Sequence, residues 1–75
     1  MQRILDGYIY DTDKAILLWF DESNGRRYFA TPNSRYFVVF PTGEFKVVTV
    51  DFVKSILGIH DIARYKEVFG EPKEG

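Results

Sequence analysis

The residues best placed for binding chemistry are arginines set among aromatic side chains between positions 26 and 40. This stretch is typical of two strands joined by a short turn. Its candidate partner-binding residues are Arg26, Arg27, Tyr28, Arg35 and Phe37. Aromatic rings beside cations can stack single-stranded bases, and tyrosine and arginine are enriched at the hot spots of protein interfaces. The same pairs also stabilise a sheet across its strands, by about 0.2–1 kcal/mol each.

The charge of the chain favours a protein over a nucleic acid as the partner of this stretch. Ten basic and eleven acidic residues give a net charge of −1, whereas nucleic-acid-binding domains usually have a strong basic excess. The aromatic spacing of the RNA-recognition motif is not matched either. Protein binding, nucleic-acid binding and simple reinforcement of the sheet remain the three interpretations of the stretch.

Residue types that catalyse reactions or bind metals are sparse in the rest of the sequence. His60 is the only histidine and cysteine is absent, so a zinc site has too few ligands. Asp11 and Asp13 stand two positions apart, but residues 14–16 do not continue a calcium-loop pattern. We therefore expect these aspartates to form a turn and His60 to lie in a turn or at a helix junction. We expect a protein that is not an enzyme, with no catalytic residue, no metal site and no cofactor.

Length and composition indicate one small domain. The chain has 75 residues, of which 45% are hydrophobic and 17% aromatic, and aromatic side chains bury about 150–250 Å² each. We expect a single domain over residues 1–70 and a polar tail over 71–75. The absence of cysteine suits a reducing compartment, and no apolar run reaches the ~20 residues of a membrane span. A cytoplasmic protein without a membrane partner is therefore expected.

The first two thirds of the sequence predict antiparallel strands. Asp6-Gly7 is a hairpin turn dipeptide between two short apolar pieces. The further predicted strands cover residues 15–20, 26–31, 35–40 and 44–49, with a turn or loop between each strand and the next. We expect the apolar set Tyr36, Val38 and Phe40 to pack beneath helices, which would leave aromatics beside arginines on the opposite face.

The last third predicts two helices. The first covers Val50–Leu57, with Thr49 as N-cap and Gly58 as its stop, and the second covers Ile62–Phe69, between Asp61 and Gly70. The side chains expected to face the sheet are Phe52, Ile56, Leu57, Tyr65 and Phe69. The predicted fold class is thus α+β: a small antiparallel β-sheet, built as a meander, followed by two short C-terminal helices packed on one face.

Three segments resemble a family of small proteins carried by bacterial plasmids, conjugative elements and phages. They are Tyr10-Asp11-Thr12 with Ala15, then residues 28–31 leading into 34–37, and finally residues 64–70 with their Tyr-x-x-x-Phe-Gly ending. The resemblance implies a mobile-element setting, in which such cofactor-free proteins commonly act by occupying a host protein. Some members look like inhibitors of CRISPR–Cas effectors, whereas others regulate transfer or pair with toxins.

These observations lead to one expected function and two alternatives. We expect a non-enzymatic, protein-binding inhibitor or regulator encoded by a mobile genetic element. Its partner would be a host or element-encoded protein, and an anti-CRISPR protein that blocks a Cas effector is the most specific candidate. The alternatives are a single-stranded nucleic-acid-binding domain and a structural oligomerising domain, for instance a homodimer.

Overall fold

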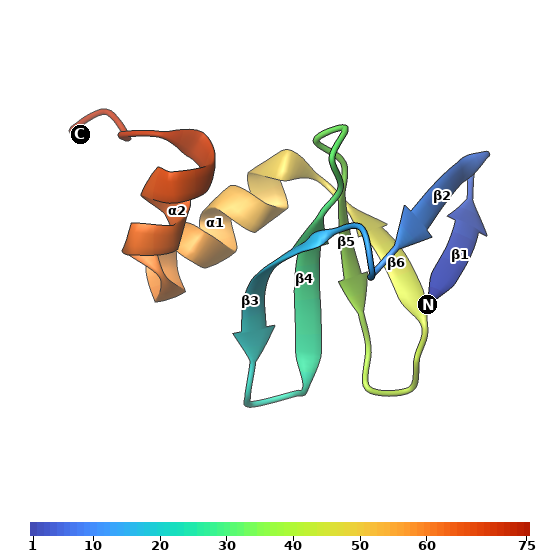
Figure 1. Ribbon diagram of the computed structural model, residues 1–75. Helices are drawn as coiled ribbons and strands as arrows, with labels where there is room; N and C mark the ends of the chain where they lie inside the picture. The colour runs from blue at the N-terminus through green and yellow to red at the C-terminus, as the bar shows by residue number, and fades with distance from the viewer.

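Six antiparallel strands are followed by two helices along the chain (Figure 1). The computed structural model describes residues 1–75. The strands are β1 (Gln2–Leu5), β2 (Tyr8–Asp11), β3 (Ile16–Asp21), β4 (Arg26–Ala30), β5 (Tyr36–Val39) and β6 (Phe45–Val48), and the helices are α1 (Val50–His60) and α2 (Ile62–Phe69). The predicted α+β fold, a strand meander followed by two C-terminal helices, is confirmed. No helix has the length and apolar character needed to cross a membrane.

The first two strands form a hairpin that is a separate two-stranded sheet. Its turn residues Asp6 and Gly7 have φ values of 51° and 81°, the left-handed conformation that a two-residue hairpin of this type requires. Ile4 pairs with Ile9 across the hairpin, and Leu5 pairs with Tyr8. The hairpin stands beside the four-stranded sheet in Figure 1, and β2 leads across to β3.

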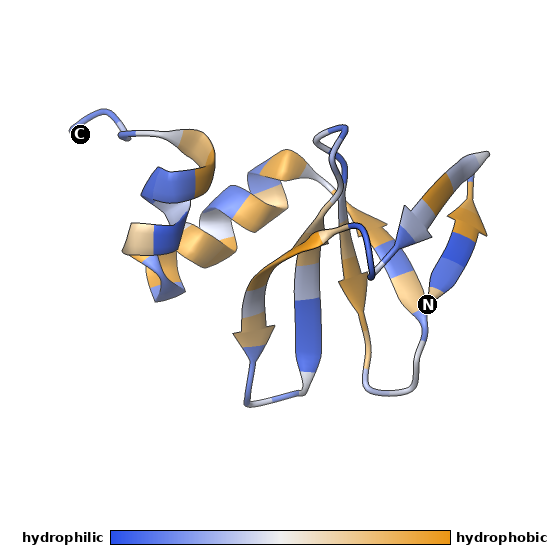
Figure 2. Cartoon of the chain, in the orientation of Figure 1, coloured by the Kyte–Doolittle hydropathy of each residue, from blue (hydrophilic) through white to orange (hydrophobic).

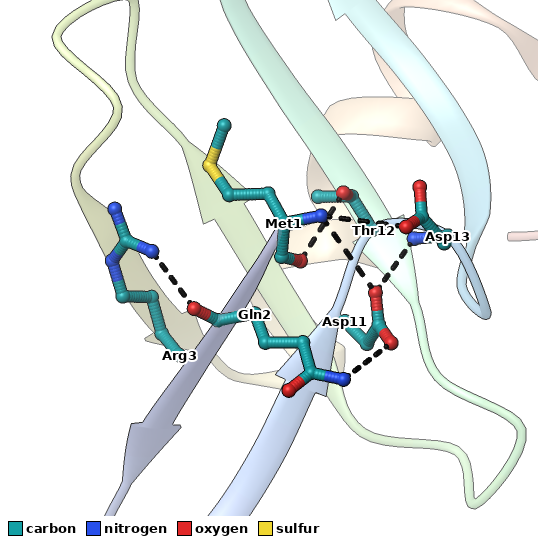
Figure 3. A network of polar contacts seen from close by, with 6 residues as sticks. All are labelled: Met1, Gln2, Arg3, Asp11, Thr12 and Asp13. Atoms are coloured by element: carbon teal, nitrogen blue, oxygen red, sulfur yellow. Dashed lines mark hydrogen bonds and ion pairs between the residues drawn. The ribbon is translucent and has the colours of Figure 1, made fainter.

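Asp11, at the end of β2, ties the hairpin to the segment that follows it (Figure 3). Its carboxylate accepts hydrogen bonds from the Gln2 side-chain amide at 3.0 Å and from the Asp13 backbone N–H at 2.9 Å. The amino group of Met1 lies 4.0 Å from this carboxylate and 3.5 Å from that of Asp13. The hydrogen bond from the Asp13 N–H has the largest effect and that from the Gln2 amide the next largest; both lower the pKa of Asp11, because they favour the charged form.

The remaining strands form one sheet in the order β3-β4-β5-β6. The residues that lie side by side on one face, which we call the helix face, include Trp19, Tyr28, Val38 and Lys46. The residues on the opposite face, which we call the hairpin face, include Leu17, Phe29, Phe37 and Val47. A bulge between Leu17 and Trp19 shifts the β3 register. In Figure 2 the hydrophobic colour runs through β3 and β5, whereas the turn between β3 and β4 is hydrophilic.

The core on the hairpin face is built from stacked aromatic rings. Phe37 is fully buried, and its ring centroid lies 5.1 Å from that of Phe29 and 5.4 Å from that of Phe45. Tyr10 from the hairpin meets Phe37 edge-on at 5.4 Å, and Leu5 packs against the same cluster. The hairpin therefore covers the face that the sequence had suggested would be exposed.

The core on the helix face joins the sheet to both helices. Leu18, Val53 and Leu57 are buried together, and half-buried side chains of α2 surround them, namely Tyr65, Val68 and Phe69. Tyr36 lies in this cluster and Val38 is buried on the same face, which confirms the predicted direction of these two side chains.

The helix ends follow the predicted caps with one correction. The Thr49 hydroxyl accepts from the Phe52 N–H at 3.1 Å, and the Asp61 carboxylate accepts from the Arg64 N–H at 3.0 Å. The prediction that Gly58 stops the first helix is wrong, because α1 continues to His60. The Asp61 N–H closes the helix by donating to the carbonyl of Leu57. Gly58 does not adopt the positive φ of a helix-ending glycine, so the helix runs through it.

Candidate partner-binding surface

The five residues predicted to bind a partner do not share one exposed face. Tyr28 is 5% exposed on the helix face, and Phe37 is fully buried on the hairpin face. Arg26 lies on the side of Tyr28, and Arg27 lies on the side of Phe37. The prediction of an exposed arginine–aromatic face is therefore wrong, because helices cover one side of the sheet and the hairpin covers the other.

The three arginines are exposed, and each guanidinium lies over an aromatic ring. The pairs are Arg26 over Phe40 at 4.9 Å, Arg27 over Phe20 at 5.0 Å and Arg35 over Tyr8 at 3.5 Å. Exposed contacts of this kind contribute about 0.5–1 kcal/mol. None of these arginines forms an ion pair; the ion pairs of the chain involve Met1, Arg64 and Lys66. The rings hold the guanidinium groups in place, and the N–H groups of each guanidinium remain available to an acidic group.

The helices leave part of the helix face uncovered, and a groove of about 290 Å³ lies there. In Figure 1 both helices sit toward the β3 side of the sheet, away from β6. The residues that line the groove are Arg26, Tyr28, Val38, Phe40, Lys46, Val47, Val48, Thr49 and Phe52. Two of these residues are cations and six are apolar or aromatic. The groove is our candidate partner-binding site.

Phe52 forms the helical wall of the groove. The Thr49 cap fixes the first turn of α1, and this places the Phe52 ring with its centroid 6.2 Å from that of Tyr28. Phe52 nevertheless remains 47% exposed. A large aromatic side chain that is half-covered on one side and open on the other has apolar area left for a partner to bury.

Lys46 lies on the opposite side of the groove. It stands in register with Val38 on the helix face, and it has no ion-pair partner. Neither Lys46 nor Phe52 is among the site residues expected from the sequence. The alternation of Lys46 with Phe45 and Val47 was visible, but only the strand register reveals that this lysine faces the same side as Tyr28.

His60 lies outside the groove, at the junction of the two helices. Its ring stacks on that of Trp19 with centroids 4.6 Å apart, and both residues border a shallow hollow with Asp21 and Ser23. The Ser23 hydroxyl donates to the Asp21 carboxylate at 2.6 Å and is the main cause that lowers the pKa of Asp21. No group of three or more His, Cys, Asp or Glu side chains is placed to hold a metal ion.

The comparisons with known proteins add no relative. No protein-family model, no curated protein and no solved structure matches this chain. The chemistry of the groove therefore follows from its own residues. An apolar floor can bury an apolar side chain, and Arg26 and Lys46 can pair with an acidic group beside it.

Proposed function

We propose that this chain is a small protein-binding domain, which inhibits or regulates its partner by occupying part of the partner's surface through the groove. The observation that carries the proposal is the half-exposed Phe52 ring beside an apolar floor, with Arg26 and Lys46 unpaired at the rim. Aromatic residues and arginine are the side chains most enriched at interface hot spots.

The partner is a host or element-encoded protein. The mobile-element resemblance supports a Cas effector as the most specific candidate, because some members of that family look like inhibitors of such effectors. A domain of 75 residues can act sterically: it needs only to cover a working surface of the effector, and it needs no chemistry of its own.

Site-specific photo-crosslinking tests this proposal. A crosslinking phenylalanine analogue is placed at Phe52 and, as a control, at Ile59, which is 76% exposed on the same helix but outside the groove. In lysate of a bacterium that carries such elements, position 52 should give a protein adduct and position 59 should not. Excess unlabelled wild-type chain should compete for the adduct, and the Phe52→Asp chain should not. Equal adducts from both positions would contradict the assignment of the groove.

A cleavage assay then tests the Cas candidate. Wild-type chain should inhibit DNA cleavage by an effector complex purified from the same bacterium. The variant Phe52→Asp should inhibit at least about 30-fold less well, the loss that corresponds to a hot spot of about 2 kcal/mol. Ile59→Asp should inhibit like wild type. Full cleavage at a saturating concentration of wild-type chain would exclude the Cas effector as the partner. Other host or element-encoded proteins would then be the remaining candidates.

Single-stranded nucleic acid is the second candidate, and one contact favours it. The Arg35 guanidinium lies 3.5 Å from the centre of the exposed Tyr8 ring, and bases stack on arginine and aromatic planes of this kind. The three arginine–aromatic pairs lie on different parts of the surface, however, and a single strand needs a continuous cationic track. Protein binding is therefore the better supported function.

A further inference from the structure

The pairing of β5 with β6 determines which backbone groups of β6 face outward. The Phe40 N–H donates to the Glu44 carbonyl at 2.8 Å, so these two residues are a hydrogen-bonded pair. Antiparallel pairs alternate between hydrogen-bonded and non-hydrogen-bonded types. The next hydrogen-bonded positions on β6 are therefore Lys46 and Val48, which stand opposite Val38 and Tyr36.

Phe45 and Val47 consequently direct their N–H and C=O groups away from β5. β6 is the last strand of its sheet, and no backbone or side-chain hydrogen bond outside the ladder involves these groups. Phe45 lies at the end that the Arg3 side chain covers, whereas Val47 is 38% exposed. The accessible part of this edge is therefore centred on Val47.

The other edge of the sheet is interrupted. β3 carries the bulge between Leu17 and Trp19, and the Arg64 guanidinium occupies the Leu17 carbonyl at 2.6 Å. Bulges and covered backbone groups are the usual means by which proteins block strand pairing at an edge. β6 has no bulge, and no side chain bonds to its outward backbone groups, so β6 is the edge better suited to pair with another strand.

Two hollows flank the open edge, and each is lined by at least one cation that forms no ion pair. The groove on the helix face includes Lys46. A second hollow, of about 220 Å³, is lined by Ser34, Arg35, Tyr36, Val47, Val48 and Val50. Val47 and Val48 border both hollows. The edge therefore presents apolar side chains at its centre and a positive charge toward each side.

We infer that the partner contributes an extended segment, which adds as a strand to β6 at Val47 and carries acidic side chains on both sides of an apolar centre. This inference rests on the proposed function and deepens it. In strand addition the main-chain bonds supply affinity and pockets for alternate side chains supply specificity. One acidic residue lies opposite Lys46, apolar residues lie opposite Val47 and Val48, and a second acidic residue faces Arg35.

A palindromic peptide tests the binding mode directly. The probe is the capped hexapeptide Thr-Glu-Val-Val-Glu-Thr, which presents the same pattern in either strand direction. Titrated into ¹⁵N-labelled chain, it should shift the amide signals of residues 45–49. It should also slow exchange of the Val47 N–H about tenfold at a concentration of about nine times its Kd. The same peptide with N-methylated valines, or with lysine in place of glutamate, should do neither. Equal binding of the N-methylated peptide, or an unchanged Val47 exchange rate at saturation, would overturn the inference.

Variants of the chain separate this inference from the proposed function. Val47→Pro removes the outward N–H without removing a bond between β5 and β6, and proline is tolerated where an edge N–H faces solvent. In the Val47→Pro chain the yield of the crosslinked partner should fall at least tenfold. Val47→Thr, which keeps the N–H, should give the wild-type yield. If Val47→Pro retains the partner and Phe52→Asp loses it, strand addition is wrong and the groove stands. If neither variant changes capture, the proposed function itself fails.

A second copy of the chain is the competing occupant of this edge. Sedimentation velocity of the free chain over a range of concentrations should show a monomer. A dimer that Val47→Pro abolishes would assign the edge to self-pairing and would overturn the inference of an acidic partner strand.

Discussion

The guanidinium of Arg64 donates a 2.6 Å hydrogen bond to the carbonyl oxygen of Leu17, 47 residues earlier in the chain. This bond fastens α2 to the outer edge of β3. Arg64 also donates to Glu67 at 2.9 Å within α2, so both terminal nitrogens of its guanidinium are held. One residue thus docks the last helix and occupies a carbonyl that another strand would otherwise use.

Replacing Arg64 by alanine should loosen this junction. The loss should lower the free energy of unfolding by about 1–2 kcal/mol, since hydrogen bonds to charged groups are among the stronger ones. Urea unfolding followed by circular dichroism measures the change. Lys66→Ala, which removes only an exposed ion pair with Glu71, is the matched control and should cost less than about 1 kcal/mol. Equal losses for the two variants would argue against a docking role for Arg64.

Replacing Phe37 by alanine should unfold the domain or nearly so. Its ring stacks on Phe29 and Phe45 and meets Tyr10, and a buried phenylalanine truncated to alanine costs about 3–5 kcal/mol. Phe37→Leu, which keeps most of the volume, should cost less. Thermal unfolding distinguishes this structural role from the binding role expected from the sequence. A Phe37→Ala chain that melts like wild type would contradict the burial of this residue.

The Asp11 carboxylate should make stability depend on acid pH. The Asp13 N–H and the Gln2 amide lower its pKa below the ordinary 3.8, so the unfolded chain takes up this proton more readily than the folded one. The stabilisation is therefore present above about pH 4 and is lost as the pH falls through the folded pKa. Asp11→Asn should be less stable at neutral pH, and its stability should fall less steeply in acid.

Urea unfolding of both proteins at several pH values between about 7 and 2 measures this effect. The Asp21 carboxylate, whose pKa the Ser23 hydroxyl lowers, contributes in the same direction and keeps part of the slope in the Asp11→Asn chain. Parallel stability curves for the two proteins would show that the Asp11 network does not differ between the folded and unfolded states.

Labelled single-stranded DNA and RNA should bind weakly. The net charge of −1 gives little attraction to phosphate, and the arginine–aromatic pairs do not form one track. Fluorescence anisotropy at two salt concentrations measures the affinity. Tight binding that falls steeply with salt, and that Arg35→Ala weakens, would favour the nucleic-acid alternative over protein binding.

Local signals in the sequence predicted most of the elements. Asp6-Gly7 specified the first turn and Thr49 capped α1, because a turn or a cap is decided by a few neighbouring residues. The end of α1 was misjudged for the same reason: Gly58 is a stop signal locally, but the helix continues past it to His60, whose ring stacks on Trp19 of β3. Of the five candidate site residues, the exposure of the three arginines followed from their charge, while the burial of Tyr28 and Phe37 did not.

The residue pattern alone predicts an α+β domain with an antiparallel meander, two capped helices and arginines among aromatic side chains. Which side of each strand meets solvent depends instead on how the layers pack. Strand periodicity divides residues into two faces but does not say what covers each face. The hairpin buries Phe37, the helices bury Tyr28, and the strand register brings Lys46 and Phe52 together at the groove. These contacts join residues far apart in the chain, so they depend on how the layers pack.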